Sequence, residues 1–286
     1  MKDWHFASLE GVPLAQLYQA FAAAFADYLL PLQLDEAGLH TMLQRRGYVP
    51  GLSGGVFAGE RLIGFHFICL GDWQGRRTAY DTASGVLPEA RGQRLSQQLF
   101  AWLAPRWREQ GVQQALLEVL AQNTAARRSY AATGFALSRQ FDCLQLQARP
   151  PLALPEAMTV VVDASNDWPA ASLDWFAAQP AWQNSTRALA ASPQRFERVG
   201  LYRQGELQAL ALLNPASGEL PLFAVHPSYR RQGLGQALIA SAAARSEKPL
   251  YFNNLDADGP SVRLLRKLGA TSVALQHEMS WDLTQP

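Results

Sequence analysis

The stretch "VHPSYRRQGLGQAL", residues 225–238, decides the fold. It follows an apolar run, "PLFAV", and passes through a proline, two arginines and Gly-x-Gly into an alanine-rich helical pattern. A strand that enters a helix through such a turn presents unpaired backbone N–H groups at the positive end of the helix dipole, which is a phosphate-binding arrangement. Gly233 and Gly235 let the backbone approach a ligand closely, because they carry no Cβ. The stretch therefore predicts a strand–loop–helix unit for an anion, and Arg230 and Arg231 suit a diphosphate.

Two familiar phosphate loops do not fit this stretch. A Walker loop needs Gly-x-x-x-x-Gly-Lys-Ser/Thr, which the sequence lacks. A dinucleotide-binding loop needs a third small residue, but Leu238 stands at that place. A basic turn before a surface helix remains the alternative interpretation of this stretch taken alone.

A weaker copy of the stretch, "VLPEARGQRLSQQLF" at 86–100, stands about half a chain earlier. On both sides of "ARPPLALPEA", 148–157, the same order of elements recurs: a hairpin, a strand ending in Val-x-Pro, a basic loop, a helix, a strand, and a helix that ends at glycine. The first hairpin turns at Gly59 and the second at Gln204-Gly205. A repeat of domain size predicts two copies of one fold.

Strands that alternate with helices after a hairpin favour an α/β fold with a mixed sheet. We therefore expect two tandem domains, each a central mixed β-sheet flanked by helices. The N-terminal domain covers residues 1–149, a Pro-rich linker covers 150–156, and the C-terminal domain covers 157–286. Residues 11–47 and 165–198 are helical or irregular in pattern and differ between the halves, which is typical of the substrate side.

Composition excludes several classes of protein. The chain has 286 residues, of which 48% are apolar, and 25 basic and 24 acidic residues give a net charge of +1. This balance gives no overall basic field for nucleic acid or an anionic membrane. Cys69 and Cys143 lie in strand-like runs and are predicted to be buried free thiols.

Neither a metal nor a membrane is expected. The five histidines have no metal-ligand spacing. The N-terminus has no apolar segment of signal-peptide length, and the longest apolar stretch is broken by Asp27. We expect a soluble, cytoplasmic protein; its oligomeric state does not follow from the sequence.

The loop residues resemble the phosphate loop of the GNAT superfamily of acyl-CoA N-acyltransferases, Gln/Arg-x-x-Gly-x-Gly/Ala after a strand ending Val-x-Pro. The second half matches it in full, with Arg230, Arg231, Gln232, Gly233, Leu234 and Gly235. In the first half, Arg91, Gly92, Gln93, Arg94, Leu95 and Ser96 fill the same places, with Arg94 in place of the first glycine. The resemblance covers about residues 55–145 and 197–282.

This resemblance implies that acetyl-CoA is the cosubstrate and that no metal takes part. Besides the two loops, it assigns cosubstrate binding to the strand ends before them and to one residue further on: Gly85, Val86, Leu87, Ala224, Val225 and Asn123. Asn123 is also predicted to cap the helix that follows it. A backbone N–H of the strand carrying Gly85 to Leu87 would polarise the thioester carbonyl.

The stretch "LLEVLAQNTAARRSYAATGF", 116–135, resembles the family's second signature, Asn-x-x-Ala-x-x-x-Tyr-x-x-x-Gly-Phe. The resemblance makes Tyr130 the general acid for the leaving thiolate. Glu118 stands where the ribosomal-protein alanine N-acetyltransferases have their base, and a partly buried carboxylate could serve in that way. The structural alternatives are a tyrosine packed on the sheet and a glutamate exposed at a strand edge.

The second half lacks both groups, since Asn253 aligns with Glu118 and Leu265 with Tyr130. We therefore expect the first domain to transfer an acetyl group directly to a primary amine of a small molecule or peptide. Two alternatives remain open: catalysis by the C-terminal domain, as in mycothiol synthase, and a CoA-binding sensor or scaffold without turnover. The acceptor site is guessed from family layout to include Tyr28, Asp35, Glu36, Trp73 and Tyr80.

Overall fold

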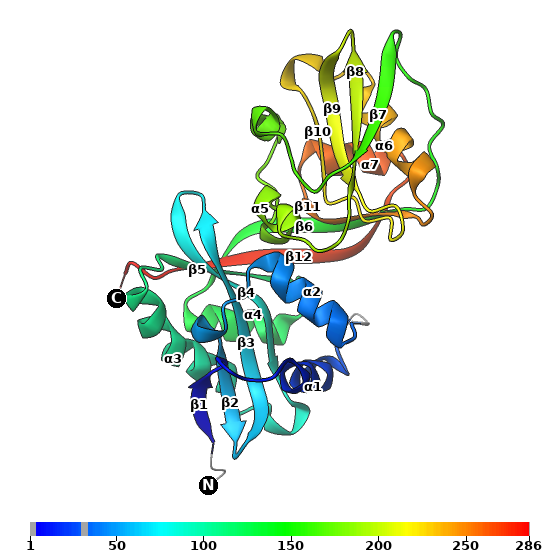
Figure 1. Ribbon diagram of the computed structural model, residues 1–286. Coiled ribbons are helices and arrows are strands. Elements are labelled where there is room, and N and C mark those ends of the chain that lie inside the picture. Colours follow the sequence, from blue (N-terminus) through cyan, green and yellow to red (C-terminus); the bar gives the residue numbers. More distant parts are fainter. Residues whose placement is uncertain (1–3, 30–33, 286) are drawn as a thin grey trace. The chain divides into compact units, whose positions relative to one another are not determined.

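The computed structural model describes residues 4–29 and 34–285 (Figure 1). The chain divides into two compact units: Met1–Arg139 with His277–Pro286, and Gln140–Gln276. The unit boundaries differ from the expected domain limits at 149 and 157. The difference arises because two long strands, β6 (Ala136–Leu146) and β12 (Thr271–Asp282), contribute residues to both units.

The first unit is an α/β structure whose strands pair in the order β1-β2-β3-β4-β5. Neighbouring strands are antiparallel except β4 and β5, which are parallel. Its elements are β1 (His5–Ser8), α1 (Leu14–Phe25), α2 (Glu36–Arg46), β2 (Gly54–Ala58), β3 (Arg61–Trp73), β4 (Arg76–Val86), α3 (Leu95–Glu109), β5 (Gln114–Leu120) and α4 (Thr124–Thr133), with short 3₁₀ turns at Pro50–Leu52 and Pro88–Ala90. The expected mixed sheet is confirmed.

The parallel pairing of β4 with β5 is short and positions the site. It joins Thr78–Asp81 to Gln114–Leu117, and the described residues form no further pair beyond that point. Residues 82–86 of β4 therefore separate from the end of β5. Such a split leaves backbone groups of β4 available to a ligand on the edge toward β5, while the other edge stays paired with β3.

The core of the first unit explains one glycine on β2. Helix α3 buries a stripe with Leu95, Leu99 and Leu103 against the sheet. A Cβ on Gly54 would lie 2.8 Å from Leu99 Cδ1, which is closer than side chains pack. Glycine at this position therefore lets α3 lie close to the strand.

The second unit repeats the pattern, as predicted. Four antiparallel strands pair in the order β10-β9-β8-β7, and β11 pairs antiparallel with Phe141–Leu146 of β6. The predicted hairpin turn at Gln204-Gly205 is confirmed, and both residues have the positive φ of a tight hairpin, 51° and 81°. Its elements are β7 (Met158–Ala164), α5 (Thr186–Ala190), β8 (Glu197–Arg203), β9 (Glu206–Leu213), β10 (Leu222–Val225), α6 (Leu234–Arg245), β11 (Leu250–Asp256) and α7 (Pro260–Lys267), with 3₁₀ turns at Ala170–Trp175, Trp182–Asn184 and Pro227–Tyr229.

The two stretches that differ between the halves also differ in structure. The stretch 11–47 contains α1 and α2, whereas 165–198 contains two 3₁₀ turns, the five-residue helix α5 and irregular segments. This agrees with the prediction of helical or irregular structure. In the part of the chain that the structure describes, no helix is long and apolar enough to cross a membrane.

Candidate active site

A cavity of about 700 Å³ opens where β4 separates from β5 in the first unit. Its walls come from the end of α1 and the turn after it, the end of β4, the loop before α3, and the first turns of α3 and α4. Nine of the predicted site residues line it: Gly85, Val86, Arg91, Gly92, Arg94, Leu95, Ser96, Asn123 and Tyr130. The cavity lies within the range that binds small molecules and cosubstrates.

The loop before α3 presents a helix N-terminus to this cavity. Gly92 and Arg94 both have positive φ, 79° and 58°, so the backbone turns in the left-handed region at two places. Arg94 thus adopts the conformation that glycine favours, at a cost of about 1–2 kcal/mol. The first turn of α3 and Arg94 line the cavity, and a helix N-terminus of this kind is a common place for an anion to bind.

Arg91 is held by protein groups. Its guanidinium donates to both carboxylate oxygens of Asp27, at 2.6 and 2.8 Å, and to the carbonyls of Ala24 and Val86, at 2.9 and 3.1 Å. This side chain therefore ties the end of α1 to the end of β4. The ion pair lowers the pKa of Asp27 through the hydrogen bond from Arg91.

Two predicted binding residues face elsewhere. Leu87 is buried and donates its N–H to the Ile63 carbonyl, 2.9 Å away on β3. Gln93 folds back on its own loop and donates to the Ala90 carbonyl at 3.3 Å. Since successive N–H groups of a strand point to opposite edges, the Val86 N–H faces the edge that β5 leaves.

Tyr130 reaches the cavity from α4. Burial raises the pKa of Tyr130 well above its usual range, the negative charge of Asp81 raises it further, and a hydrogen bond with Ser84 lowers it. Its ring packs edge-on to Phe100 and Phe135 of the core, with centroid distances of 6.1 and 6.0 Å. The ring is therefore fixed by packing while the hydroxyl borders the cavity.

Asn123 confirms its predicted capping role, since its Oδ1 accepts from the Ala126 N–H at 3.1 Å. It also hydrogen-bonds Tyr28 at the cavity wall, where burial raises the pKa of the Tyr28 hydroxyl. Among the guessed acceptor residues, Tyr28 lines the cavity. Asp35 caps α2, with its Oδ1 accepting from the Gly38 N–H at 2.8 Å.

Glu118 lies one residue past the point where β4 and β5 stop pairing. Its Oε2 accepts a hydrogen bond of 3.0 Å from the Tyr80 hydroxyl. Burial raises the pKa of Glu118 to about 7, against the opposing charge of Arg46, and the negative charge of Glu278 adds to the rise. A carboxylate with this pKa is half ionised near neutral pH, which suits a general base.

Glu118 and Tyr130 lie on opposite faces of the sheet. Glu118 contacts Tyr80, and Arg46 of α2 reaches the same strand through Thr82 Oγ1 at 2.8 Å. Tyr130, in contrast, belongs to α4 and packs against Phe100 of α3. Tyr130 lines the cavity, whereas Glu118 does not and lies beside the end of the β4–β5 pairing on the other face.

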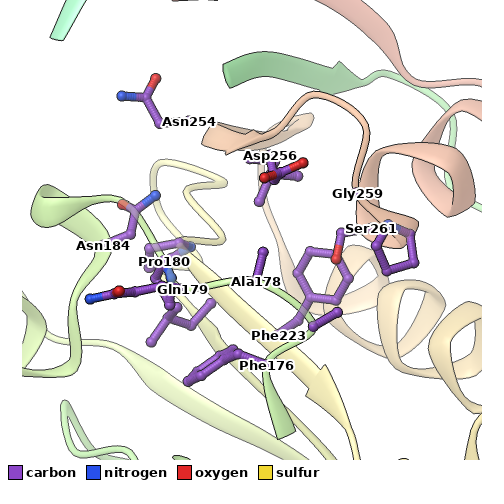
Figure 2. Close-up of a pocket in the computed structure, with 15 residues that line it drawn as sticks. Phe176, Ala178, Gln179, Pro180, Asn184, Phe223, Asn254, Asp256, Gly259 and Ser261 are labelled. Atoms are coloured by element: carbon purple, nitrogen blue, oxygen red, sulfur yellow. The ribbon is translucent and has the colours of Figure 1, made fainter. Parts of the chain in front are cut away.

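In the second unit the loop keeps the same backbone. Arg231 and Gly233 have positive φ, 65° and 83°, at the places of Gly92 and Arg94. Arg230 donates to the carbonyls of Trp175 and Val225 at 2.7 and 3.3 Å, as Arg91 does in the first unit. Figure 2 shows the pocket of about 60 Å³ that borders β10 in this unit.

This pocket is much smaller than the cavity of the first unit, because protein side chains occupy more of the space beside β10 than beside β4. Residues 176–180 line one side of it, and Phe223 of β10 lines it too (Figure 2). Phe223 is equivalent to Ser84, since each lies two residues before the last residue of its strand. Among the other predicted residues of this half, Ala224 and Leu234 are buried, and Gln232 lies in the exposed loop. A Cβ added to Gly235 would lie 2.8 Å from Leu264 Cδ2. Gly235 thus permits α6 and α7 to pack closely.

The sequence reasoning missed three polar residues beside the cavity: His66, Asp81 and Ser84. They lie on neighbouring strands and contact one another. In the sequence, His66 stands alone in an apolar run, and Asp81 and Ser84 belong to a strand whose alternation is interrupted at Thr82. A regular strand would place Asp81 and Ser84 on opposite faces, so the pattern alone did not bring them together.

Comparison with solved structures shows similar chains of the same two-part architecture. A tandem GNAT protein from the clavulanic acid biosynthesis pathway, solved without AcCoA, superposes with a TM-score of 0.73 at 17% identity, covering 98% of this chain and 99% of that one. A GCN5-related N-acetyltransferase from Sphaerobacter thermophilus gives a TM-score of 0.69 at 15% identity, with 98% and 96% covered. A putative acetyltransferase from Pyrococcus horikoshii gives 0.64 at 13%, with 98% and 89% covered.

Sequence comparison gives the family directly. No curated protein matches the sequence. A sequence model of the Acetyltransferase (GNAT) family matches twice, at residues 14–135 and 165–270, and these ranges together span more than half of the chain. Each match falls on one of the two repeated folds, as the repeat in the sequence predicted. The chain therefore belongs to the GNAT family of acetyltransferases and carries the GNAT fold twice.

Proposed function

We propose that the chain is an acetyl-CoA-dependent N-acetyltransferase whose first unit transfers the acetyl group directly to a primary amine of a small molecule or peptide. The observation that carries the proposal is the cavity at the end of the β4–β5 pairing. It combines an anion-binding helix N-terminus, an available strand edge and Tyr130 in one place. Glu118 lies at the same split from the other face of the sheet.

The residues present fit acetyl-CoA as a substrate. The first turn of α3, with Gly92 and Arg94, offers donors for the diphosphate. The edge of β4 at Gly85 and Val86 offers backbone hydrogen bonds to the amide-rich arm of the cosubstrate, and the Val86 N–H is the candidate donor to the thioester oxygen. Arg91 contributes by holding the loop against α1 rather than as a free phosphate ligand.

The chemistry then follows from proton positions. Glu118, ionised above a pKa of about 7, takes a proton from the acceptor ammonium. The neutral amine attacks the thioester carbonyl, and the C–S bond breaks as the tetrahedral intermediate collapses. The Tyr130 hydroxyl gives its proton to the departing thiolate, the nitrogen of the intermediate loses its second proton as the amide forms, and Tyr130 regains a proton. The net products are an N-acetylated amine, CoA thiol and one proton.

The second unit supports a single active site in the first. At the places of Ser84 and Tyr130 it has Phe223 and the fully buried Leu265. The pocket of about 60 Å³ beside Phe223 is well below the usual size for a cosubstrate, and none of residues 230–235 lines it. CoA binding by residues 230–235 therefore stays a prediction from the sequence, and we propose that this loop mainly braces β10 through Arg230.

The test is release of free thiol from acetyl-CoA across a panel of amines, with the full-length chain. We expect turnover with at least one primary amine, and one acetyl-CoA bound per chain in calorimetry. Ala125→Trp is designed to fill the cavity from an exposed position on α4 and should abolish binding. Leu265→Met is the matched control, since it changes the place equivalent to Tyr130 while keeping core volume.

The outcomes separate the alternatives. Binding without turnover across the panel would favour a CoA sensor. Turnover that survives Ala125→Trp but is lost on Gly233→Val would place the chemistry in the second unit. Either result would overturn the assignment of catalysis to the first unit.

A further inference from the structure

Two buried side chains, His66 and Asp81, meet the half-buried Ser84 at the cavity of the first unit. Ser84 Oγ lies 2.7 Å from His66 Nδ1 and donates to Asp81 Oδ2. The same Oδ2 lies 3.0 Å from His66 Nδ1. His66 is 1% exposed and Asp81 is 6% exposed, while Ser84 lines the cavity. The cluster therefore connects a buried ionisable pair to the place where the substrate would bind.

A β-bulge builds this cluster. In the ladder between β3 and β4, His66 pairs with Ser84 and Ile68 pairs with Asp81, and the register shifts between these pairs. Thr82 is the extra residue on β4, so Asp81 and Ser84 point to the same face although they are three residues apart. Bulges often re-aim side chains next to active sites. Here the bulge brings the carboxylate to the face that carries His66.

The cluster reaches Tyr130 through Ser84. Ser84 hydrogen-bonds the Tyr130 hydroxyl, and both residues line the cavity. If Tyr130 gave up its proton alone, a buried phenolate would remain beside the negative charge of Asp81. Burial and Asp81 both raise the pKa of Tyr130, so that phenolate is unfavourable. A second proton supplied through Ser84 removes this cost.

A hydrogen-bond acceptor lies within reach of each ring nitrogen of His66. Nε2 lies 3.3 Å from the Ser96 carbonyl, which can only accept a hydrogen bond, and 3.3 Å from Ser96 Oγ. Nδ1 faces Asp81 Oδ2, which also accepts when it is ionised. The titratable groups facing the cluster and its tyrosine are Asp81 of β4, Tyr130 of α4 and Tyr28 after α1.

The arrangement differs from a serine nucleophile with its base. In such a triad the serine and the acid bind different nitrogens of the histidine, so that one nitrogen accepts while the other donates. In this chain Ser84 and Asp81 share Nδ1. The geometry therefore favours passing a proton outward through Ser84 over removing a proton from it.

We propose that His66, Asp81 and Ser84 form a proton relay that resupplies Tyr130 during departure of the thiolate, an inference that rests on the proposed function. As the C–S bond breaks, the Tyr130 proton moves to sulfur. The Ser84 hydroxyl turns from Asp81 Oδ2 and gives its proton to the Tyr130 oxygen, and the His66 Nδ1 proton moves to Ser84 Oγ. His66 keeps its Nε2 proton toward the Ser96 carbonyl. After CoA leaves, the ring regains a proton from solvent by the reverse path. None of the three residues touches the reacting atoms, since each acts through Tyr130.

The test compares Ser84→Ala and Asp81→Asn in the full-length chain with Ser53→Ala as the matched control. Ser53 is a fully buried serine of the same unit whose hydroxyl bonds backbone groups of Val49 and Ile68. We expect the two relay variants to lower single-turnover rates ~10- to 100-fold, a fraction of what a general acid contributes. The KM for acetyl-CoA should change less than about twofold, because relay acts on the chemical step. Ser53→Ala should lower thermal stability and leave the rate intact.

Rates in mixtures of H₂O and D₂O give a readout that a purely structural role would not move. Wild type should show a curved dependence on the deuterium fraction, because several protons move together, and Ser84→Ala should show a linear one. A linear wild-type dependence, or an acetyl group found on Ser84 by mass spectrometry after acid quench, would overturn the relay.

A second measurement does not depend on turnover. Long-range ¹H–¹⁵N correlation of the His66 ring in the full-length chain should show protons on both nitrogens. A ring with a single proton would overturn the relay. If wild type fails to acetylate any amine while His66 carries two protons, the proposed function fails and the proton-carrying cluster stands.

Discussion

Replacing Glu118 by glutamine should have opposite effects on rate and on stability. Burial raises the pKa of this carboxyl from 4.5 to about 7. A group whose folded pKa is raised binds its proton more tightly in the folded state than in the unfolded chain. Its contribution to stability is therefore full below about pH 4.5 and is lost as the pH rises to about 7.

The magnitude follows from the shift. At 1.36 kcal/mol per pKa unit, ionising Glu118 costs the folded state about 3 kcal/mol at pH 8. Glu118→Gln keeps the size and removes the charge, so it should raise the free energy of unfolding at pH 8 by up to about 3 kcal/mol. For a unit of this size the melting temperature should rise by several degrees. The gain should disappear as the pH falls toward 5.

The rate should move the other way. With the base half ionised near pH 7, wild-type kcat/KM should fall about tenfold for each pH unit below 7. Glu118→Gln should lose rate by ~100-fold or more at pH 7 and should follow only the ionisation of the acceptor amine. Denaturant melts and thiol-release assays at pH 5 to 8 measure both effects on the same samples.

Glu278→Gln is the matched control for this substitution. Glu278 accepts from Arg139 at 2.6 and 2.8 Å and from Ser138 at 2.8 Å, so losing its charge should destabilise the unit. Because Glu278 helps to raise the pKa of Glu118, the variant should also move the kinetic midpoint to lower pH. A Glu118→Gln chain that is less stable than wild type at pH 8 would refute this reasoning. So would a Glu118→Gln chain whose kcat/KM still falls about tenfold for each pH unit below 7.

Three further substitutions test the site and its frame. Tyr130→Phe should lower turnover ~100- to 10,000-fold while the affinity for acetyl-CoA, measured by calorimetry, stays within about twofold; unchanged turnover would remove Tyr130 from the chemistry. Arg94→Gly should raise the free energy of unfolding by about 0.5–1 kcal/mol, because the relief of strain at a φ of 58° exceeds the entropy that glycine adds to the unfolded chain. A melting temperature below that of wild type would contradict this. Gly235→Val should destabilise the second unit by about 1–3 kcal/mol through contact with Leu264, which chemical denaturation can measure; an unchanged midpoint would show that α6 and α7 are free to separate.

Much of the fold could be predicted from local patterns. Each loop combines a Val-x-Pro strand end, a basic turn and a helix start within about fifteen residues, so short-range geometry alone specifies the unit. Arg94 and Gly233 both make left-handed turns at equivalent places in the two loops. The repeat can therefore be recognised from the order of turns and elements, although the two halves share few identical residues. The motif around Tyr130 is also a short-range pattern, and it correctly places Tyr130 on a helix, α4.

Long-range geometry could not be predicted in this way. The bulge at Thr82 depends on how β3 and β4 align, and the sequence gives no sign of which strand carries the extra residue. The partner of Arg91 was also hidden, since Asp27 lies 64 positions earlier. The place of Glu118 beside Tyr80 and Arg46 depends on α2, a helix that was predicted only as helical or irregular structure.

The first unit closes with the last residues of the chain, and this affects how the protein is made. His277–Pro286 belongs to the unit that begins at the N-terminus, and it brings Glu278 to Arg139 and Trp281 to Phe135. On a ribosome, the whole of Gln140–Gln276 is synthesised in between, which takes on the order of ten seconds at bacterial-like elongation rates. During that time the nascent first half has an unpaired strand edge and an unfilled place for Trp281. Its completion must therefore wait until the strand carrying Glu278 and Trp281 has been synthesised, so the half that would hold acetyl-CoA is expected to finish folding only after residues 140–276 have been made.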